Sequence, residues 1–371
     1  MTSRPEEPGV VLRQLIDALG EAVLTDPKSL AAARTDRSGK TSDFEPICVV
    51  EAKSTDDVVA VMKIANQTLT PVVTRGAGSG LAGGAIGSLG EIVLSLAKMN
   101  KIIEISTENR WAQVQAGVIN QDLNLAAQKL GLWFTPDPAS RLWSTVGGNI
   151  ATNAGGLLCA KYGVTREAVR QLTVVMADGE VMTLGHETVK GVTGLDLVGL
   201  MVGSEGTLGV ITEAKVSLKP VDPHAVTTLS AKAADITLAA RAIQETIRHG
   251  LQPSVFELID ETCTRYITEH LEGVVLEKSF NMLIAQTDGA GAEILAEKIA
   301  QVWRDLGLEV QGDLRVAGGQ RERDLDHAVE HTGRAHEPER HDIAAEARIF
   351  YLFEVLFDFV VGHGDGNVRD C

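Results

Sequence analysis

The chain has 371 residues, of which 44% are apolar, and a formal net charge of −16. This length predicts two or three domains with sizeable cores. The acidic charge argues against nucleic acid as a partner, because phosphates would be repelled at long range. No long apolar run free of charges is present, and the polar start Met1–Pro8 does not resemble a secretory signal. We therefore predict a cytoplasmic protein, with peripheral contact to a membrane left open.

The first part of the chain predicts an α/β unit. Apolar residues at helical spacing predict an amphipathic helix over Val10–Leu19. A strand over Ile47–Val50, a helix over Ser54–Gln67 and a strand over Pro71–Thr74 follow. The polar residues after Ser54 can cap that helix, so the order strand, helix, strand is well marked.

The next segments are mostly strands. The pattern predicts one helix, over Asp122–Leu130, which ends at Gly131. It also predicts a β-hairpin with an Asp178-Gly179 turn between Gln171–Met176 and Glu180–Leu184. The remaining predicted strands are Ile92–Leu96, Ile102–Ser106, Trp111–Ala116 and Leu208–Leu218.

The segment Pro220–Pro223 is a predicted domain boundary, because glycine becomes sparse after it. Beyond it we predict a second, α+β domain. Its expected helices are Ala231–His249 and Ala292–Leu306, and its expected strands are Pro253–Leu258 and Asn281–Ala285. The predicted organisation is an N-terminal helical segment (1–42), a first domain (43–222) and a second domain (223–371).

Three glycine-rich loops stand out in the first domain. The first, Gly76–Gly84, follows a predicted strand. Its glycines let several backbone N–H groups point at one anion, and a diphosphate suits such a loop. An ordinary loop is the alternative. A P-loop is excluded because no Gly-Lys-Ser/Thr follows, and a dinucleotide fingerprint is disfavoured because Gly83–Gly87 would break the required helix.

The second loop comprises Pro136–Ser140 and Ser144–Gly156, and mixes Asn and Thr side chains with paired glycines. A long turn is the simpler interpretation, yet long loops inside a compact domain are usually functional. The third loop is Gly203–Ile211.

Together the three loops resemble the FAD-binding domain of the vanillyl-alcohol oxidase family, over about Asp43 to Pro220. They are most similar to the branch with D-lactate dehydrogenase, D-2-hydroxyglutarate dehydrogenase and the glycolate oxidase catalytic subunit. The resemblance implies an α+β fold: a two-subdomain FAD-binding domain of the vanillyl-alcohol oxidase type, then an α+β substrate (cap) domain. It implies FAD contacts by Arg75, Gly76, Ala77, Gly78, Ser79, Gly80, Pro138, Thr145, Gly147, Gly148, Asn149, Thr152, Asn153, Gly155, Glu205, Gly209 and Ile211.

The resemblance also implies how the flavin is held. Members with covalent FAD usually carry a histidine in the first loop, where Ser79 stands here, and no histidine lies between Met1 and Gly185. We therefore expect noncovalent FAD.

The second domain resembles the same family in parts. Pro253–Asp260 resembles the first strand of the cap domain, and Arg340–Ile343 resembles a substrate-side segment. His363 matches the first histidine of a metal-binding run, which suggests zinc or manganese, but Arg369 stands where the second histidine is expected. One interpretation is a site with a different ligand set. The other, which the sequence favours, is a truncated or frameshifted chain with an incomplete cap domain.

The resemblance implies oxidation of a small 2-hydroxy acid, of the D-lactate, glycolate or D-2-hydroxyglutarate type, by hydride transfer to flavin N5. Arg340 is the candidate clamp for the substrate carboxylate, and His363 the candidate base or metal ligand. Electrons would pass to a quinone, cytochrome, partner flavoprotein or oxygen, among which the sequence does not choose. Partner subunits or a homodimer are also compatible with the resemblance.

Two other functions stay open. A flavin-binding subunit or remnant without activity of its own would explain the altered histidine run. A different enzyme on the same FAD fold, such as a sugar oxidase or an enolpyruvyl reductase, is disfavoured by the cap-like segment Pro253–Asp260.

Overall fold

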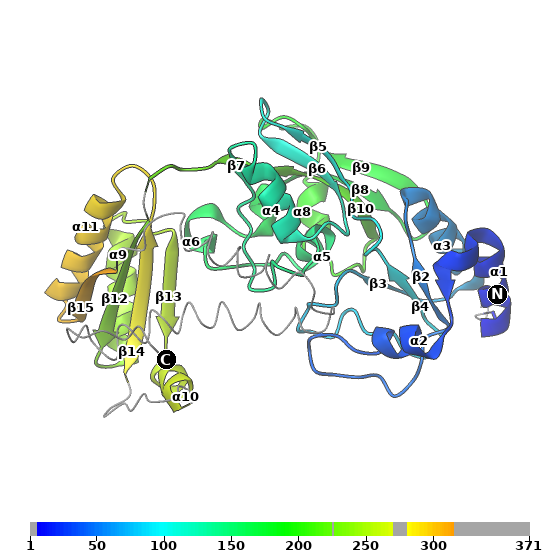
Figure 1. The fold of residues 1–371 in the computed structure, drawn as a ribbon, viewed down its shortest axis with the longest axis horizontal. Coiled ribbons are helices and arrows are strands. Elements are labelled where there is room, and N and C mark those ends of the chain that lie inside the picture. Colours follow the sequence, from blue (N-terminus) through cyan, green and yellow to red (C-terminus); the bar gives the residue numbers. More distant parts are fainter. Residues whose placement is uncertain (1–5, 225, 270–279, 315–371) are drawn as a thin grey trace, which may run out of the picture. The chain divides into compact units, whose positions relative to one another are not determined.

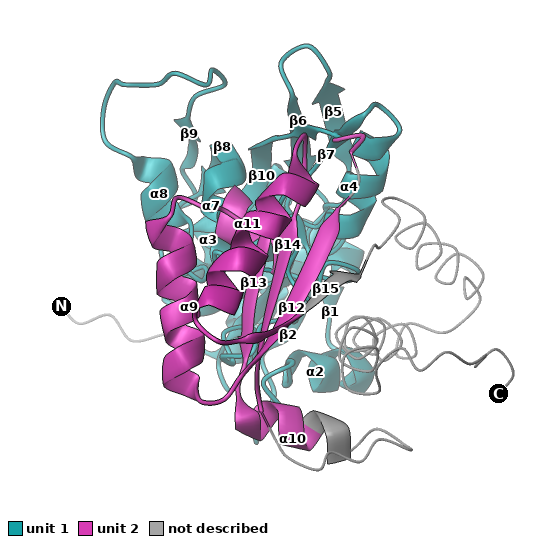
Figure 2. Ribbon diagram, turned by 90° about the vertical axis from the view of Figure 1, so that its left-hand side faces the viewer, with its two compact units in different colours: residues 1–156, 163–221 teal, residues 157–162, 222–371 magenta. Residues whose placement is uncertain are grey.

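The computed structural model describes residues 6–224, 226–269 and 280–314. The chain divides into two compact units (Figure 2). Unit 1 comprises Met1–Gly156 and Gly163–Val221, and unit 2 comprises Leu157–Tyr162 and Asp222–Cys371. The short segment Leu157–Tyr162 is therefore part of unit 2, although the chain on both sides of it belongs to unit 1.

Unit 1 contains a four-stranded sheet in the order β1-β2-β4-β3 (Figure 1). Strands β2, β4 and β3 run parallel, with Val93 of β4 aligned with Val49 and with Val73, and β1 pairs antiparallel at the edge. The strands predicted in this region are confirmed. The strands of the sheet are β1 (Val23–Leu24), β2 (Cys48–Glu51), β3 (Val72–Arg75) and β4 (Ile92–Ser95).

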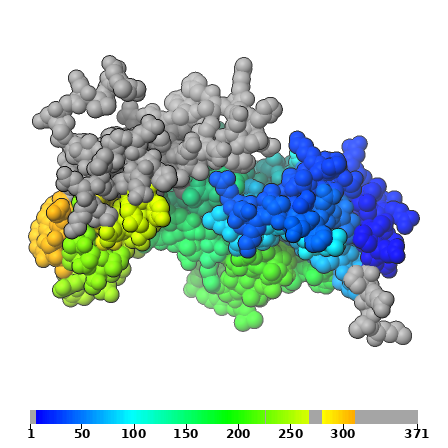
Figure 3. Space-filling view, turned by 90° about the horizontal axis from the view of Figure 1, so that it is seen from below, coloured from blue at the N-terminus to red at the C-terminus, as the bar shows by residue number. Residues whose placement is uncertain are grey.

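Helix α3 (Thr55–Thr68) confirms the prediction and begins with a reciprocal cap. The Ser54 side chain accepts the Asp57 N–H at 3.2 Å, and the Asp57 carboxylate accepts the Lys53 N–H at 2.8 Å. The helix packs beside α1 (Pro8–Leu19), which was also predicted. Figure 3 shows α1, drawn in dark blue, on the outside of unit 1.

The second sheet of unit 1 is antiparallel, in the order β5-β6-β10-β8-β9. Its predicted hairpin is confirmed: Gly179 has a φ of 83°, and the Met176 N–H donates to the Glu180 carbonyl at 2.8 Å. Val175 and Val210 of this sheet share a core with α3 and the parallel sheet. The strands are β5 (Ile102–Ser106), β6 (Trp111–Gln115), β8 (Val169–Val175), β9 (Val181–Gly185) and β10 (Val210–Ser217).

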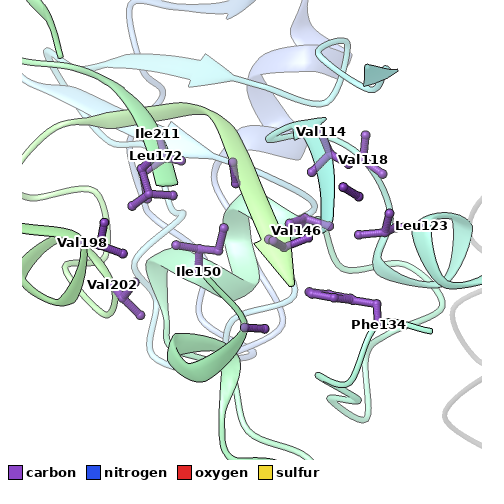
Figure 4. Packing of buried hydrophobic residues seen from close by; sticks show 14 of the residues in the cluster. Val114, Val118, Leu123, Phe134, Val146, Ile150, Leu172, Val198, Val202 and Ile211 are labelled. Carbon is purple, nitrogen blue, oxygen red and sulfur yellow. The ribbon is translucent and has the colours of Figure 1, made fainter. Parts of the chain in front are cut away.

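Short helices form a second core with this sheet. Val146 and Ile150 of α5 (Val146–Ala151) are fully buried in the same cluster as Leu172 of β8 (Figure 4). This packing fixes α5, which lies in the second glycine loop. The other elements of unit 1 are η1 (Gly20–Ala22), α2 (Pro27–Ala33), α4 (Asn120–Gln128), β7 (Leu132–Trp133), α7 (Thr165–Ala168), α8 (Leu197–Met201) and β11 (Lys219–Pro220).

Unit 2 contains an antiparallel sheet in the order β13-β14-β12-β15, whose apolar side chains pack with two helices. The Trp303 ring is completely buried there, and its Nε1–H donates to Thr246 Oγ1 at 3.0 Å. The elements are α6 (Cys159–Tyr162), β12 (Thr227–Ala233), α9 (Ile236–Arg248), β13 (Val255–Ile259), α10 (Glu261–Glu269), β14 (Asn281–Thr287), α11 (Ala292–Asp305) and β15 (Glu309–Leu314).

One expected helix is wrong at its start. Ala231–Ala233 belongs to β12, and α9 begins only after Asp235, whose side chain accepts the Leu238 N–H at 2.8 Å. Strand β12 pairs on both sides, with β14 and with β15. Nearly all of its side chains are buried, so it lacks the alternation that marks a half-exposed strand. Among the described helices, none is long and apolar enough to cross a membrane.

The core of unit 1 makes a testable prediction. Leu172 is fully buried, whereas Leu195 is 86% exposed. We expect Leu172→Ala to lower the free energy of unfolding by about 2–5 kcal/mol, because it leaves a cavity beside α5. Leu195→Ala should change it by no more than about 0.5 kcal/mol. Denaturant unfolding of both variants measures this difference, and equal effects would contradict it.

Candidate functional site

The three glycine loops, although far apart in sequence, meet in unit 1. The third loop is tied to the end of α5, because Gly203 and Glu205 donate their N–H groups to the carbonyls of Ile150 and Ala151 at 3.0 and 2.8 Å. The first loop reaches both others. A Cβ on Gly84 would lie 3.3 Å from Glu205 Oε2, and a Cβ on Gly76 would lie 2.5 Å from Thr145 Oγ1.

The first loop is closed by the guanidinium of Arg75 at the end of β3. Its Nη1 donates to the carbonyls of Thr35 and Ala85, both at 2.8 Å. Burial lowers the pKa of Arg75, and the nearby Asp36 carboxylate opposes that shift. An arginine nevertheless keeps its charge in a protein. The cation therefore joins the segment after α2 to the far end of the loop.

Gly78 occupies a position that tolerates no side chain. Its φ is +70°, and a Cβ there would lie 2.4 Å from Nη2 of Arg75. Its carbonyl accepts the Arg37 N–H at 3.0 Å. The loop backbone and the arginine that closes it are therefore in direct contact.

The backbone N–H groups of this loop are available to a ligand. Among the hydrogen bonds of the described residues, none has a backbone N–H of Gly76–Gly84 as its donor. The residues Gly76, Ala77, Gly78, Ser79 and Gly80 are half-buried. A set of half-buried amides without acceptors suits an anion such as a diphosphate.

In contrast, the first backbone N–H groups of α5 already donate hydrogen bonds within the protein. The N–H groups of Val146, Gly147 and Gly148 donate to Val118 O, Ala116 O and Thr145 Oγ1 at 2.7, 2.8 and 3.1 Å. Gly147 allows this close approach, because a Cβ there would lie 2.5 Å from the Cβ of Ala116. The helix start is therefore bound to the segment that follows β6, and its first three amides are not available to a ligand.

Several side chains beside the loops have unsatisfied polar atoms. Asn149 is 3% exposed, and its Nδ2 has no partner among the described residues. Ser144 Oγ in the second loop and Ser204 Oγ in the third are also buried atoms without a hydrogen-bond partner among the described residues. An unpaired buried polar group costs about 1–3 kcal/mol. A polar cofactor that bound between the loops could satisfy such groups, so these residues fit the cofactor that the sequence suggested.

Three other expected contact residues of the second loop have structural partners. Pro138 is buried, and its carbonyl accepts the Arg141 N–H at 2.8 Å. Thr152 and Gly155 are exposed, and Thr152 Oγ1 donates to the Gly148 carbonyl at 3.0 Å. Asn153 has a φ of 48°, and its Oδ1 accepts the Arg166 N–H at 3.0 Å.

At the end of the third loop the side chains face the core. A Cβ on Gly209 would lie 2.8 Å from Val174 Cγ1. Ile211 is 5% exposed and packs in the cluster that contains Leu172 (Figure 4). Any contact of these two residues with a cofactor would therefore involve their backbone.

Sequence reasoning missed the residues that support the first loop from outside. The Asp36 carboxylate accepts hydrogen bonds from the N–H groups of Ser38 and Ala85 at 2.9 and 3.4 Å, and the Arg37 N–H donates to the Gly78 carbonyl. They lie about 40 positions before the loop, and nothing in their local pattern signals the contact. The expected catalytic and metal-binding residues Arg340 and His363 lie outside the described residues. Within those, no group of three or more metal-binding side chains is found.

Comparison with known proteins agrees with this geometry. Residues 46–185 match the FAD binding domain family, and residues 222–352 match the C-terminal domain of FAD linked oxidases. The fold and the loops therefore define a flavoprotein domain with FAD as its cofactor. The chain therefore carries matches to both domains of FAD linked oxidases, which confirms the resemblance noted in the sequence.

Characterised relatives match over part of their length. A D-lactate dehydrogenase of Anaerostipes hadrus is 38% identical over 262 residues, which is 69% of this chain and 55% of that protein. The glycolate oxidase subunit GlcD of Bacillus subtilis is 39% identical over 66% of this chain and 52% of its own. A D-2-hydroxyglutarate dehydrogenase of Xanthomonas citri is 35% identical over 70% and 54%. The chain spans about half the length of these relatives.

Solved structures confirm the predicted α+β fold of the vanillyl-alcohol oxidase type. An alkyldihydroxyacetonephosphate synthase superposes with a TM-score of 0.70, at 20% identity, over 87% of this chain and 63% of that chain. A p-cresol methylhydroxylase gives 0.69 over 84% and 67%, also at 20% identity. These similarities concern the fold alone.

The first loop makes a second testable prediction. We expect Gly78→Ala to weaken FAD binding at least about tenfold, equivalent to about 1.4 kcal/mol. The new methyl group would displace the Arg75 guanidinium from its two carbonyls and strain the loop. Isothermal titration of the apoprotein with FAD measures the change.

The matched control is Gly90→Ala. Gly90 has a similar φ of +78°, but a Cβ there meets nothing within 4 Å. It should cost stability through backbone strain alone and leave FAD affinity within about twofold. Equal losses of affinity in the two variants would show that the Arg75 contact is irrelevant.

Proposed function

We propose that this chain binds FAD noncovalently between the three loops and serves in the oxidation of a small 2-hydroxy acid. The observation that carries the proposal is the set of half-buried amides at Gly76–Gly80, which the fold leaves without acceptors. The match to the FAD binding domain supports the diphosphate of FAD as the ligand of those amides.

Different loops would hold different parts of the cofactor. The amides of the first loop would donate to the diphosphate, because several converging N–H groups stabilise negative charge. Asn149 and the neighbouring hydroxyls of Ser144 and Ser204 supply neutral polar atoms suited to the uncharged parts of the molecule. Glu205, on the third loop, would contact the ribose side, where a carboxylate can accept hydroxyl protons.

The proposed substrate class follows from the relatives. Their names refer to D-lactate, glycolate and D-2-hydroxyglutarate, which share a hydroxyl group on the carbon next to a carboxylate. Bound FAD would accept the hydride from that carbon. The hydroxyl proton would pass to a base, for which we propose His363, and Arg340 would hold the carboxylate. The product is the 2-oxo acid, and the flavin keeps two electrons.

A second function is favoured by one observation in the sequence. Arg369 occupies the place expected for a histidine ligand, and an arginine has no lone pair to give a metal. A flavin-binding subunit without activity of its own would tolerate this change. We keep this alternative beside the oxidase, and no step of the proposed reaction depends on a metal.

The third prediction concerns the cofactor. We expect the purified protein to show flavin absorbance bands, and acid precipitation to release the flavin into the supernatant. Unit 1 offers no histidine before His186, so the usual covalent attachment in the first loop has no partner here. Flavin that stays with the pellet would contradict noncovalent binding. A protein that stays colourless after incubation with FAD would contradict the cofactor site itself.

The fourth prediction concerns the reaction. Under anaerobic conditions, we expect D-lactate, glycolate or D-2-hydroxyglutarate to bleach the bound flavin, with L-lactate as the stereochemical control. His363→Ala and Arg340→Met should slow bleaching by at least about 100-fold without loss of FAD, because they would remove the base and the carboxylate clamp. Flavin that dithionite reduces but none of the three acids bleaches would instead support the inactive subunit.

A further inference from the structure

The chain passes between the two units at three places. It leaves unit 1 after Gly156, returns after Tyr162, and leaves again after Val221. The first two crossings enclose Leu157–Tyr162, the segment that contains α6. The first of these crossings comes directly after the second glycine loop. The backbone of the proposed flavin site therefore continues without a break into unit 2.

Within unit 2, this segment is held by one carboxylate, that of Asp288 just after β14. The Lys161 ammonium group forms an ion pair with Oδ1, and the Tyr162 hydroxyl donates to Oδ2 at 2.7 Å. The side chains of Lys161 and Asp288 are only 30% and 15% exposed. We refer to Lys161, Tyr162 and Asp288 as the clasp.

The charges around the clasp support its role. Burial raises the pKa of Tyr162, and its hydrogen bond to Asp288 and the charges of Asp288 and Asp222 raise it further. The Tyr162 hydroxyl is therefore kept as a proton donor. Asp222 is the first residue after the third crossing. Hydrogen bonds from the backbone and side chain of His224 lower the pKa of its carboxyl, and the Lys161 cation makes a smaller contribution in the same direction. The Lys161 cation, next to the second crossing, thus interacts with the carboxylate of Asp288 and with that of Asp222, next to the third crossing.

The other end of the segment is held in unit 1. Thr165 is fully buried, and its N–H and Oγ1 both donate to the carbonyl of Ala154, at 3.2 and 2.7 Å. The neighbouring Arg166 N–H donates to Asn153 Oδ1 at 3.0 Å. Residues 155–164, which we call the strap, therefore form a loop whose two ends meet at Asn153 and Ala154, which we call the neck. The clasp holds the opposite part of the strap, which we call its tip.

A strap fixed at both ends restricts the backbone on either side of it. Each ordered residue costs about 1–2 kcal/mol of conformational entropy, so a free tip would favour many other arrangements of the strap. The neck consists of residues of the second glycine loop, and Asn153 is held there in the left-handed region. The clasp thus reaches the flavin site through about ten residues of chain rather than through a contact.

We propose that Asp288 is a positioning residue for the flavin site: by holding Lys161 and Tyr162, it keeps Asn153–Gly156 in the conformation that binds FAD. The inference rests on the proposed function, since it assumes that the second loop contacts the cofactor. It assigns to a residue of the second unit an effect on cofactor affinity that the FAD-binding domain by itself would not have.

The test compares graded variants of the clasp. Asp288→Ala removes both contacts, Asp288→Asn removes the ion pair but keeps an acceptor for Tyr162, and Tyr162→Phe removes only the hydroxyl. We expect Asp288→Ala to raise the Kd for FAD by about fivefold or more, a typical size for coupling between distant sites. The two conservative variants should give smaller changes in the same direction. Glu297→Ala, which breaks the ion pair with Arg304 on α11, is the control and should leave the Kd unchanged.

Two further readouts separate positioning from a general loss of stability. Hydrogen exchange of the apoprotein should quicken at the amides of Thr165 and Arg166 in Asp288→Ala, and not in the control. The ultraviolet titration of tyrosine should show a lower pKa for Tyr162 in Asp288→Ala, because a hydrogen bond and a negative charge have been removed.

The outcomes are distinct. Wild-type protein that binds no FAD would refute the proposed function. Wild-type protein that binds FAD, with a Kd that Asp288→Ala leaves within about twofold, would overturn the inference. Faster exchange at Thr165 without a change in Kd would overturn it as well, because the clasp would then order Thr165 without affecting the residues that bind FAD.

Discussion

The proposed flavin site depends first on the two hydrogen bonds of the Arg75 guanidinium. They join Thr35 and Ala85, and so close a loop whose own amides make no hydrogen bonds within the described fold. Without the arginine, the free amides of the loop would hydrogen-bond to nearby acceptors in the protein or to water. The half-buried Arg75 cation prevents this at the cost of desolvation, which Asp36 partly offsets. Gly78 is then required, since its backbone lies directly against the cation.

The second constraint is the rigid attachment of α5. Its first amides bind Val118 and Ala116, and Val146 and Ile150 anchor it in the core. Helix starts often bind phosphate through free N–H groups, but the first amides of α5 already donate to the segment that follows β6. The two loops are therefore complementary. The first offers free backbone donors, and the second offers a fixed surface with the polar side chains of Ser144 and Asn149.

The sequence predicted those parts of the fold that carry a regular signal. The 3.6-residue spacing located α3 and α11, and the Asp178-Gly179 turn located the β8–β9 hairpin. It failed at Ala231–Ala233, because a strand buried on both faces has no alternation to detect. It also missed α5, because paired glycines make the segment look like a turn, although one of them, Gly147, lets the helix approach Ala116. The three loops were found from their glycines, whereas the supporting contacts of Asp36, Arg37 and Arg166 exist only in the folded chain.

The unpaired amides of the first loop also link the cofactor to the abundance of the protein. A ligand that binds only the folded state stabilises it by an amount that grows with the logarithm of its free concentration, about 2.7 kcal/mol at 100 times Kd. Because a folded domain is stable by only about 5–15 kcal/mol, this is a large share. A cell short of flavin would then hold fewer folded copies as well as fewer loaded ones. The supply of the vitamin precursor would then contribute to the level of folded protein without any change in its synthesis.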